Sequence, residues 1–158
     1  MSVIDNLLRR EDATLSGTVT VDAGGRTQYG IAELHNPEAW ADGKVTLDEA
    51  RSIFQQKYID APGFNKVVDE RLREQLIDFG VNSGPRLAIM KLQLIVGAEI
   101  DGVLGPETLD KLNRLDYINV NNQLAIQRIL MIGRLVQKRP SDLDKLSGWL
   151  NRATSFIV

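Results

Sequence analysis

Glycine, proline and asparagine residues divide most of this chain into runs whose apolar side chains recur at helical spacing. These runs are expected to form helices over residues 2–11, 27–36, 46–58, 69–81, 86–96, 106–114, 119–138 and 141–149. Thr46 and Glu49 have the spacing of a capping box, Pro85 suits the first turn of a helix, and Ser141 is expected to cap the last helix. Without repeats or low-complexity segments, the pattern predicts one mostly helical body.

One segment departs from this helical pattern. Residues 14–21 alternate β-branched side chains around Ser16-Gly17, which is typical of a short β-hairpin. The pair Gly24-Gly25 is expected to end the hairpin, and a helix is expected to start near Thr27. The predicted fold class is therefore mainly α, with a short β-hairpin.

The composition excludes several kinds of catalytic site. The chain has no cysteine, so it has no disulfide, no thiolate zinc site and no cysteine nucleophile. A serine–histidine–aspartate triad would have to use the single histidine, His35, which lies in an ordinary helical context without a nucleophile-elbow motif. We therefore expect no cofactor and no metal, and we expect any catalysis to use carboxylates.

The charge is small overall and unevenly distributed. A net charge of −2 argues against nucleic-acid binding. Residues 1–111 hold 12 Lys/Arg and 18 Asp/Glu, whereas residues 112–158 hold 7 and 3. The basic segment fits either a solvated helix face, which we favour, or contact with an anionic polymer or membrane surface. No apolar run approaches the ~20 residues of a membrane span, so no stable membrane insertion is expected.

Two carboxylates flank the hairpin pattern in a way that suits glycoside hydrolysis. Glu11 lies at the end of the first expected helix, and Asp22 lies beside the diglycine. Glycosidases need one protonated and one ionised carboxyl group across the sugar. Partial desolvation on a packed helix favours the neutral acid, whereas a solvated hairpin keeps the second group charged. Many lysozymes arrange their cleft in this way.

The chain resembles glycoside hydrolase family 108, the phage and prophage lysozymes whose second half is a predicted peptidoglycan-binding region. Residues 22–31, DAGGRTQYGI, fit the D-x-G-G-x-T-x-x-G-I motif of that family. Residues 78–85, 101–108 and 148–152 are similar to its D-x-A-V-N-x-G-P, D-G-x-x-G-P-x-T and G-W-x-x-R segments. Its leading E-G-G-Y motif is reduced here to Glu11, followed by Asp-Ala-Thr, and the hairpin is about two residues longer.

The resemblance implies roles for particular residues. Glu11 would be the general acid, Asp22 and Thr27 would hold and activate the water, and Tyr29 would contact the sugar. Asn82 would line the cleft floor or, as we favour, satisfy backbone groups where a helix ends. The plainer alternatives are a solvated helix-end carboxylate for Glu11, a turn-capping aspartate for Asp22 and an N-cap for Thr27. An inverting mechanism is expected, with carboxyl groups roughly 6.5–9.5 Å apart.

Two further motif segments are expected to have structural rather than catalytic roles. The loop that contains Asp101 is expected to be a tight loop that caps the helix at Pro106, because it offers too few oxygen ligands for calcium. Trp149 is expected to lie in the core.

The predicted protein is an endolysin-like muramidase with a lysozyme-like helical fold. Residues 1–84 are expected to form the catalytic lobe with the hairpin, and residues 85–158 a helical lobe packed with it as one body. The partner is the glycan strand of peptidoglycan, and the protein is expected to be a monomer.

The N-terminus MSVIDNLLRRED lacks the features of a signal peptide. Storage in the cytoplasm, release through a holin pore and action in the periplasm or cell wall are therefore expected. A non-catalytic wall-binding or secretion-associated protein and a lytic transglycosylase are the alternatives.

Overall fold

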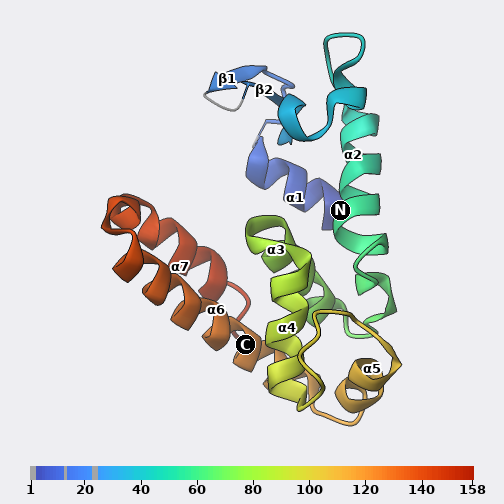
Figure 1. Ribbon diagram of the computed structural model, residues 1–158, viewed down its shortest axis with the longest axis vertical. Helices are drawn as coiled ribbons and strands as arrows, with labels where there is room; N and C mark the ends of the chain where they lie inside the picture. Colours follow the sequence, from blue (N-terminus) through green and yellow to red (C-terminus); the bar gives the residue numbers. More distant parts are fainter. Residues whose placement is uncertain (1–2, 13, 23–24) are drawn as a thin grey trace. The chain divides into compact units, whose positions relative to one another are not determined.

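The fold is mainly α-helical with a small antiparallel β-sheet, as predicted (Figure 1). The structure is a computed structural model that describes residues 3–12, 14–22 and 25–158, with the backbone only for Glu11 and Asp22. The chain divides into two compact units, Met1–Ala61 and Pro62–Val158. This boundary lies inside the predicted catalytic lobe, and the functional division at residue 84 stays a prediction.

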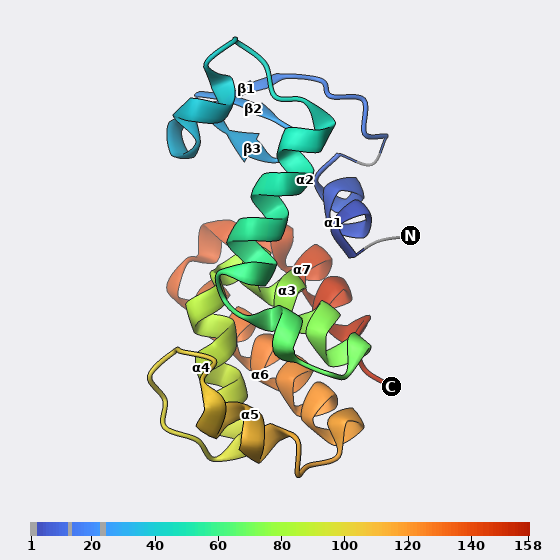
Figure 2. The same cartoon turned by 90° about the vertical axis from the view of Figure 1, so that its right-hand side faces the viewer.

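The first unit contains two helices and the three-stranded sheet. Its elements are α1 (Val3–Glu11), β1 (Thr20–Asp22), β2 (Gly25–Gln28), β3 (Ile31–Ala32), two 3₁₀ turns (Glu33–His35 and Pro37–Trp40), α2 (Leu47–Gln55) and a π-helical turn (Gln56–Asp60). Figure 2 shows the three strands side by side, in the order β1-β2-β3. Thr46 caps α2 and forms the predicted capping box with Glu49.

The hairpin turns at a different place from the one predicted. Thr20 pairs with Thr27 and Asp22 pairs with Gly25, so the chain reverses between residues 22 and 25. The prediction of a hairpin around Ser16-Gly17 is therefore wrong. Gly25 has φ +97°, a left-handed conformation that glycine adopts at little cost. Alternation of β-branched residues indicates a strand, but it does not identify the strand's partner.

The prediction of a helix from Thr27 is also wrong. Thr27 lies in β2, and the two-residue turn Tyr29-Gly30 leads directly into β3. Both turn residues have positive φ, +51° and +77°. Two-residue hairpin loops favour this geometry because it matches the twist of the strands, and it is incompatible with a continuing helix.

Packing between α1 and α2 fixes the end of α1 within the first unit. The two helices contact each other, and Leu7 and Leu8 of α1 and Phe54 of α2 are buried. Arg51 of α2 donates to Asp5 of α1 at 3.1 Å. These contacts hold α1 against α2 within the first unit.

The second unit is entirely helical in its regular structure. Its elements are a 3₁₀ turn (Phe64–Lys66), α3 (Glu70–Ser83), α4 (Pro85–Val96), α5 (Pro106–Leu112), α6 (Tyr117–Lys138), a 3₁₀ segment (Pro140–Lys145) and α7 (Leu146–Thr154). The predicted helices α3 to α6 are confirmed, with ends displaced by a few residues. Ser141 does not cap the last helix, because residues 140–145 form 3₁₀ turns before α7 begins. Asp142 there pairs with Arg139 and Lys145, and residues three apart eclipse in a 3₁₀ helix.

The core of the second unit lies among α3, α4 and α6, while α7 packs on α6. Leu72, Leu76, Phe79, Leu92 and Leu124 are fully buried. Within the parts of the chain that the structure describes, no helix combines the length and the apolar character needed to cross a membrane.

Candidate active site

A groove lined by threonines crosses one face of the small sheet. Its volume is about 420 Å³, and its lining brings together two predicted site residues, Thr27 and Tyr29. The full lining consists of Asp12, Thr14, Thr18, Thr20, Thr27, Tyr29 and Gly30. A groove of hydroxyl groups, one carboxylate and one aromatic ring suits a hydroxyl-rich ligand such as a sugar.

Strand alternation places Thr27 in this groove. Thr27 is half-buried and lies directly opposite Thr20 on the neighbouring strand. Cross-strand partners in an antiparallel sheet point to the same face, so the two threonines stand together. The preceding residue, Arg26, belongs to the opposite face, where it forms a bidentate ion pair with Glu33 at 2.7 and 2.8 Å.

Arg26 anchors the strand from the face away from the groove. Its guanidinium also stacks over the ring of the buried Trp40, 4.7 Å from the centroid. The hydrogen bond from Arg26 lowers the pKa of Glu33, so the pair is ionised at neutral pH. These contacts hold β2 and therefore the orientation of Thr27.

Tyr29 is fixed by its turn and by the segment it covers. Its positive φ is uncommon for a residue other than glycine, and such conformations persist only where the surroundings enforce them. The ring lies against Gly17, where an added Cβ would overlap the tyrosine hydroxyl and lie 2.7 Å from Cζ. Gly17 itself has φ +66°. Tyr29 and the loop of residues 14–18 therefore fit each other only with glycine at position 17.

Gln28 of β2 hydrogen-bonds to two other segments near the groove. Its Nε2 donates to the carbonyl of Gly17 at 2.7 Å, and its Oε1 accepts from the amide of Val45 at 2.7 Å. The loop, the sheet and the segment that precedes α2 are thereby joined through one side chain.

Asp12 is a groove residue that the sequence analysis did not single out. Its carboxylate accepts hydrogen bonds from the amide and hydroxyl of Thr14, the hydroxyl of Ser16 and the amide of Gly17, at 3.0–3.3 Å. Partial desolvation acts to raise the pKa of Asp12, but the hydrogen bonds from Gly17, Thr14 and Ser16 outweigh it and lower the pKa. Asp12 is therefore an ionised acceptor that shapes the loop, and the pattern Asp-x-Thr-x-Ser is a sequence signal for such a turn.

The two predicted carboxylates occupy the ends of the elements that lead to the groove. Glu11 is the last residue of α1, and the amide of Asp12 donates to the carbonyl of Leu8 at 2.7 Å. Asp22 is the last residue of β1, opposite Gly25. The side chains of Glu11 and Asp22 lie outside the described part of the structure, so their roles stay predictions.

Asn82 belongs to the second unit, where it has a structural contact. It lies in the last turn of α3, and its Nδ2 donates to the carbonyl of Asp78 at 2.6 Å. Asn82 also lines a separate pocket of that unit. Its role as a cleft residue stays a prediction.

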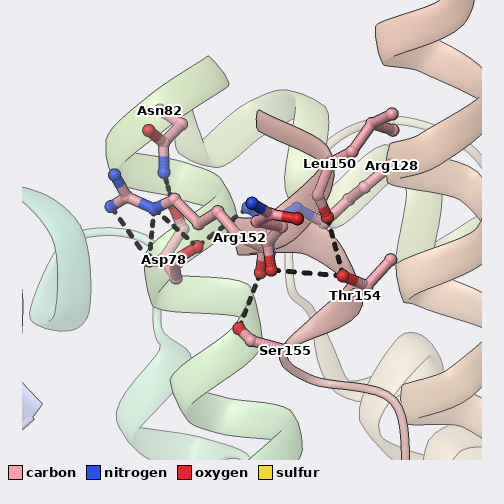
Figure 3. Close-up of polar contacts among 8 residues, drawn as sticks. Asp78, Asn82, Arg128, Leu150, Arg152, Thr154 and Ser155 are labelled. Atoms are coloured by element: carbon pink, nitrogen blue, oxygen red, sulfur yellow. Dashed lines mark hydrogen bonds and ion pairs between the residues drawn. The ribbon is translucent and has the colours of Figure 1, made fainter. Parts of the chain in front are cut away.

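A buried ion cluster joins three helices of the second unit. Asp78 of α3 pairs with Arg128 of α6 at 2.8 Å and with Arg152 of α7 at 3.0 Å (Figure 3). The guanidinium of Arg128 also stacks over Phe79 and Phe156, 5.0 and 5.5 Å from the ring centroids. We call these three charged residues the Asp78 cluster. Arg128 and Arg152 lie 50 and 74 positions from Asp78 in the chain. The motif segments D-x-A-V-N and G-W-x-x-R contain Asp78 and Arg152, whereas no motif contains Arg128.

The loop after α4 is the tight loop that was predicted, but no side chain caps α5, whose N-cap residue is Gly105. The buried Gln93 donates to the carboxylate of Asp101 at 2.7 Å and to the carbonyl of Val103 at 2.9 Å, and it accepts from the amide of Gly102 at 2.9 Å. These hydrogen bonds use the Asp101 carboxylate within the loop. Among the described residues, no group of three or more His, Cys, Asp or Glu side chains is placed to hold a metal ion.

The fold defines a mainly helical protein with a small three-stranded antiparallel sheet, and the threonine groove lies in its first unit. The model of the family Glycosyl hydrolase 108 matches residues 6–84, half of the 158-residue chain. The chain therefore belongs to glycosyl hydrolase family 108.

Among solved structures, the chain is similar to Brucella abortus SagA, with 24% sequence identity and a TM-score of 0.66. The similarity covers 96% of this chain and 95% of SagA, and it shows that the two proteins share a fold. A comparison with curated proteins finds no match.

Proposed function

We propose that this protein is a muramidase that cleaves the glycan strand of peptidoglycan, with Glu11 as the general acid. The observation that carries the proposal is the threonine groove, which lies within the segment matched by the hydrolase family. It brings Thr27 and Tyr29 together in the first unit, where α1 ends at Glu11.

Each carboxylate has a distinct task in this mechanism. Glu11 protonates the leaving oxygen, while Asp22 and Thr27 hold the water that attacks the anomeric carbon from the opposite face. Such a water requires carboxyl groups roughly 6.5–9.5 Å apart and gives an inverted anomer. Thr27 supports this route because its hydroxyl can orient a water but has no evident task in a covalent mechanism.

Asp12, the residue that follows the proposed acid, has a separate task. Its hydrogen bonds keep it ionised and shape the loop of residues 14–18. Asp12 therefore does not serve as the proton donor that a general acid must be near neutral pH.

The biological setting is proposed with the activity. The protein is an endolysin-like monomer that remains in the cytoplasm until a holin releases it to the periplasm and cell wall. Residues 1–84 carry out the chemistry, and residues 85–158 contribute wall binding.

The decisive experiment compares Glu11→Gln with Glu38→Gln on purified peptidoglycan. Glu11→Gln should lower the rate by roughly 10²–10⁴-fold, because an amide cannot donate the proton. Glu38, an exposed glutamate of the same unit, provides the control and should leave the rate unchanged. Turbidity loss and zymography measure the rate, and circular dichroism confirms that both variants fold.

Three outcomes contradict parts of the proposal. A folded Glu11→Gln variant with more than half of the normal rate rules out the acid assignment. An inactive wild type that still binds peptidoglycan supports the wall-binding alternative, which the replacement of G-G-Y by Asp-Ala-Thr after Glu11 keeps open. An anhydro-sugar end on the product, read by NMR, identifies a lytic transglycosylase.

A further inference from the structure

A second pocket lies in the helical unit, beside the Asp78 cluster. Its volume is about 270 Å³, and its lining combines cationic and apolar side chains. Pockets for complete small molecules commonly occupy roughly 300–1,000 Å³. This pocket therefore suits one residue or one group of a larger molecule.

Arg139 and Lys145 form the outer cationic wall of the pocket. Both pair with Asp142, at 3.4 and 2.8 Å. Asp142 has only 14% of its side chain exposed, whereas Arg139 and Lys145 have 59% and 55%. The carboxylate is thus covered, and the cations face the solvent. The hydrogen bond from Lys145 lowers the pKa of Asp142, so both groups are charged at neutral pH.

The inner wall carries two arginines that are more buried than the cations of the outer wall, with 5% and 22% of their side chains exposed. In the Asp78 cluster, two arginines again share one covered carboxylate, and both arginines line the pocket. Figure 3 shows Asp78 and Arg152 in contact between α3 and α7. At the outer wall, Arg139 and Lys145 share one carboxylate, so two cations face one anion there. A small anion would therefore find compensating charge at the outer wall, and hydrogen bonds between ionised partners are stronger than neutral ones.

The remaining wall is apolar. Met131 and Leu135 of α6 and Trp149 of α7 line the pocket and are half-buried. Trp149 is predicted to lie in the core, but its side chain is only half-buried and lines this pocket instead. An apolar wall beside cations favours a carboxylate attached to a small apolar group, as at the end of a short peptide.

We propose that this pocket binds a carboxylate of the peptide stems that branch from peptidoglycan strands. The proposal rests on the proposed function, because that function supplies a polymer whose charges include the carboxylates of short peptides. It also gives the basic segment after residue 111 a task. The chain would thereby bind glycan strands that carry charged stems in preference to bare strands.

The test measures binding of a synthetic stem peptide with free carboxylates to the full chain. Isothermal calorimetry measures occupancy and provides the dissociation constant. The double variant Arg139→Gln/Lys145→Gln should raise the dissociation constant at least about tenfold, given the strength of charge-assisted hydrogen bonds. Arg134→Gln/Lys138→Gln is the matched control, because it removes two exposed charges of α6 that lie outside the pocket.

An amidated peptide and inorganic phosphate test whether the pocket recognises a peptide carboxylate. The same peptide with amidated carboxylates should bind at least about tenfold more weakly, and inorganic phosphate should compete only weakly. Three results overturn the proposal: no saturable binding of the free-acid peptide, equal affinity for the amidated peptide, or an equal loss in the control variant. Phosphate that binds more tightly than the peptide also overturns it, because it identifies a phosphate site.

These experiments distinguish a failure of the muramidase proposal from a failure of the pocket proposal. Glu11→Gln should bind the peptide as the wild type does. A chain that binds the peptide but never cleaves peptidoglycan contradicts the muramidase and supports the pocket. A chain that cleaves peptidoglycan without binding the peptide contradicts the pocket alone.

Discussion

Gly17 couples the loop of residues 14–18 to the aromatic residue of the groove. It combines a positive φ with direct contact to Tyr29, and its carbonyl accepts from Gln28. Gly43 also has a positive φ, +86°, but the nearest atom to an added Cβ there is 3.9 Å away on Arg26. Replacing Gly43 therefore tests backbone strain alone, whereas replacing Gly17 tests backbone strain together with steric overlap.

Gly17→Ala should be more destabilising than Gly43→Ala. Both replacements impose about 1–2 kcal/mol of left-handed backbone strain. Gly17→Ala also forces Tyr29 to move, which should add about 1–3 kcal/mol and lower activity on peptidoglycan. Urea unfolding and the turbidity assay measure the two effects. Equal stability of the two variants would contradict the contact with Tyr29.

Replacement of Thr27 tests its hydroxyl apart from its shape. Thr27→Val keeps the volume and the strand preference but removes the hydrogen bond to the proposed water. A lost hydrogen bond of about 1–1.5 kcal/mol should lower kcat about tenfold. Thr27→Ser, which keeps the hydroxyl, should retain most of the activity, while the melting temperatures of both variants stay near that of the wild type. Full activity of folded Thr27→Val would remove Thr27 from the mechanism.

At the scale of elements, one carboxylate joins three helices of the second unit. Asp78 has 2% of its side chain exposed and pairs with arginines of α6 and α7. Removing one member of a buried ion pair leaves uncompensated charge in the interior. The helices α3, α6 and α7 therefore depend on Asp78 for their packing.

Asp78→Asn should destabilise the second unit by about 3–5 kcal/mol. The control is Asp48→Asn, since Asp48 is 91% exposed and pairs with Arg51 on the surface. Exposed pairs contribute about 0.2–1 kcal/mol, so this variant should unfold close to the wild type. Denaturant unfolding followed by circular dichroism at 222 nm gives both values. A loss below about 1 kcal/mol for Asp78→Asn would show that the cluster does not support the packing.

At the scale of the whole molecule, carboxylates that accept hydrogen bonds occur in both units. The pKa values of Asp12, Glu33, Glu49, Asp101 and Asp142 are all lowered. A carboxylate whose pKa is lower in the folded state stabilises the fold above its ordinary pKa. That contribution is lost as the pH falls through the folded pKa. The protein should therefore lose stability on acidification below about pH 4.

A variant of Asp101 tests the contribution of a single carboxylate to this acid dependence. The hydrogen bond from Gln93, followed by that from Val103, lowers its pKa below the ordinary 3.8. Asp101→Asn keeps an acceptor for Gln93 but no longer titrates, so its melting temperature should fall less than the wild type's between about pH 6 and about pH 3. Asp110→Asn, a change at an exposed carboxylate of the same region, should follow the wild type. A parallel fall for all three proteins would contradict this account.

The sequence by itself identified most of the helices and the family, but it predicted a helix at residues 27–36 where the structure has β2 and β3. The stops at Gly84-Pro85 and Arg139-Pro140 and the capping box at Thr46 are local signals, because backbone hydrogen bonds in helices join residues four apart. The family motifs likewise read directly from the chain, and they identified Thr27 and Tyr29, which the structure brings into one groove.

Only the tertiary structure decided the strand register and the Asp78 cluster. Residues 14–28 contain two positions where a hairpin could turn, and local preference does not choose between them. The choice depends on which residues pair and on contacts such as those of Gln28 with Gly17 and Val45. The Asp78 cluster joins residues 50 and 74 positions apart. Such contacts form only when distant helices pack, so no local pattern in the chain encodes them.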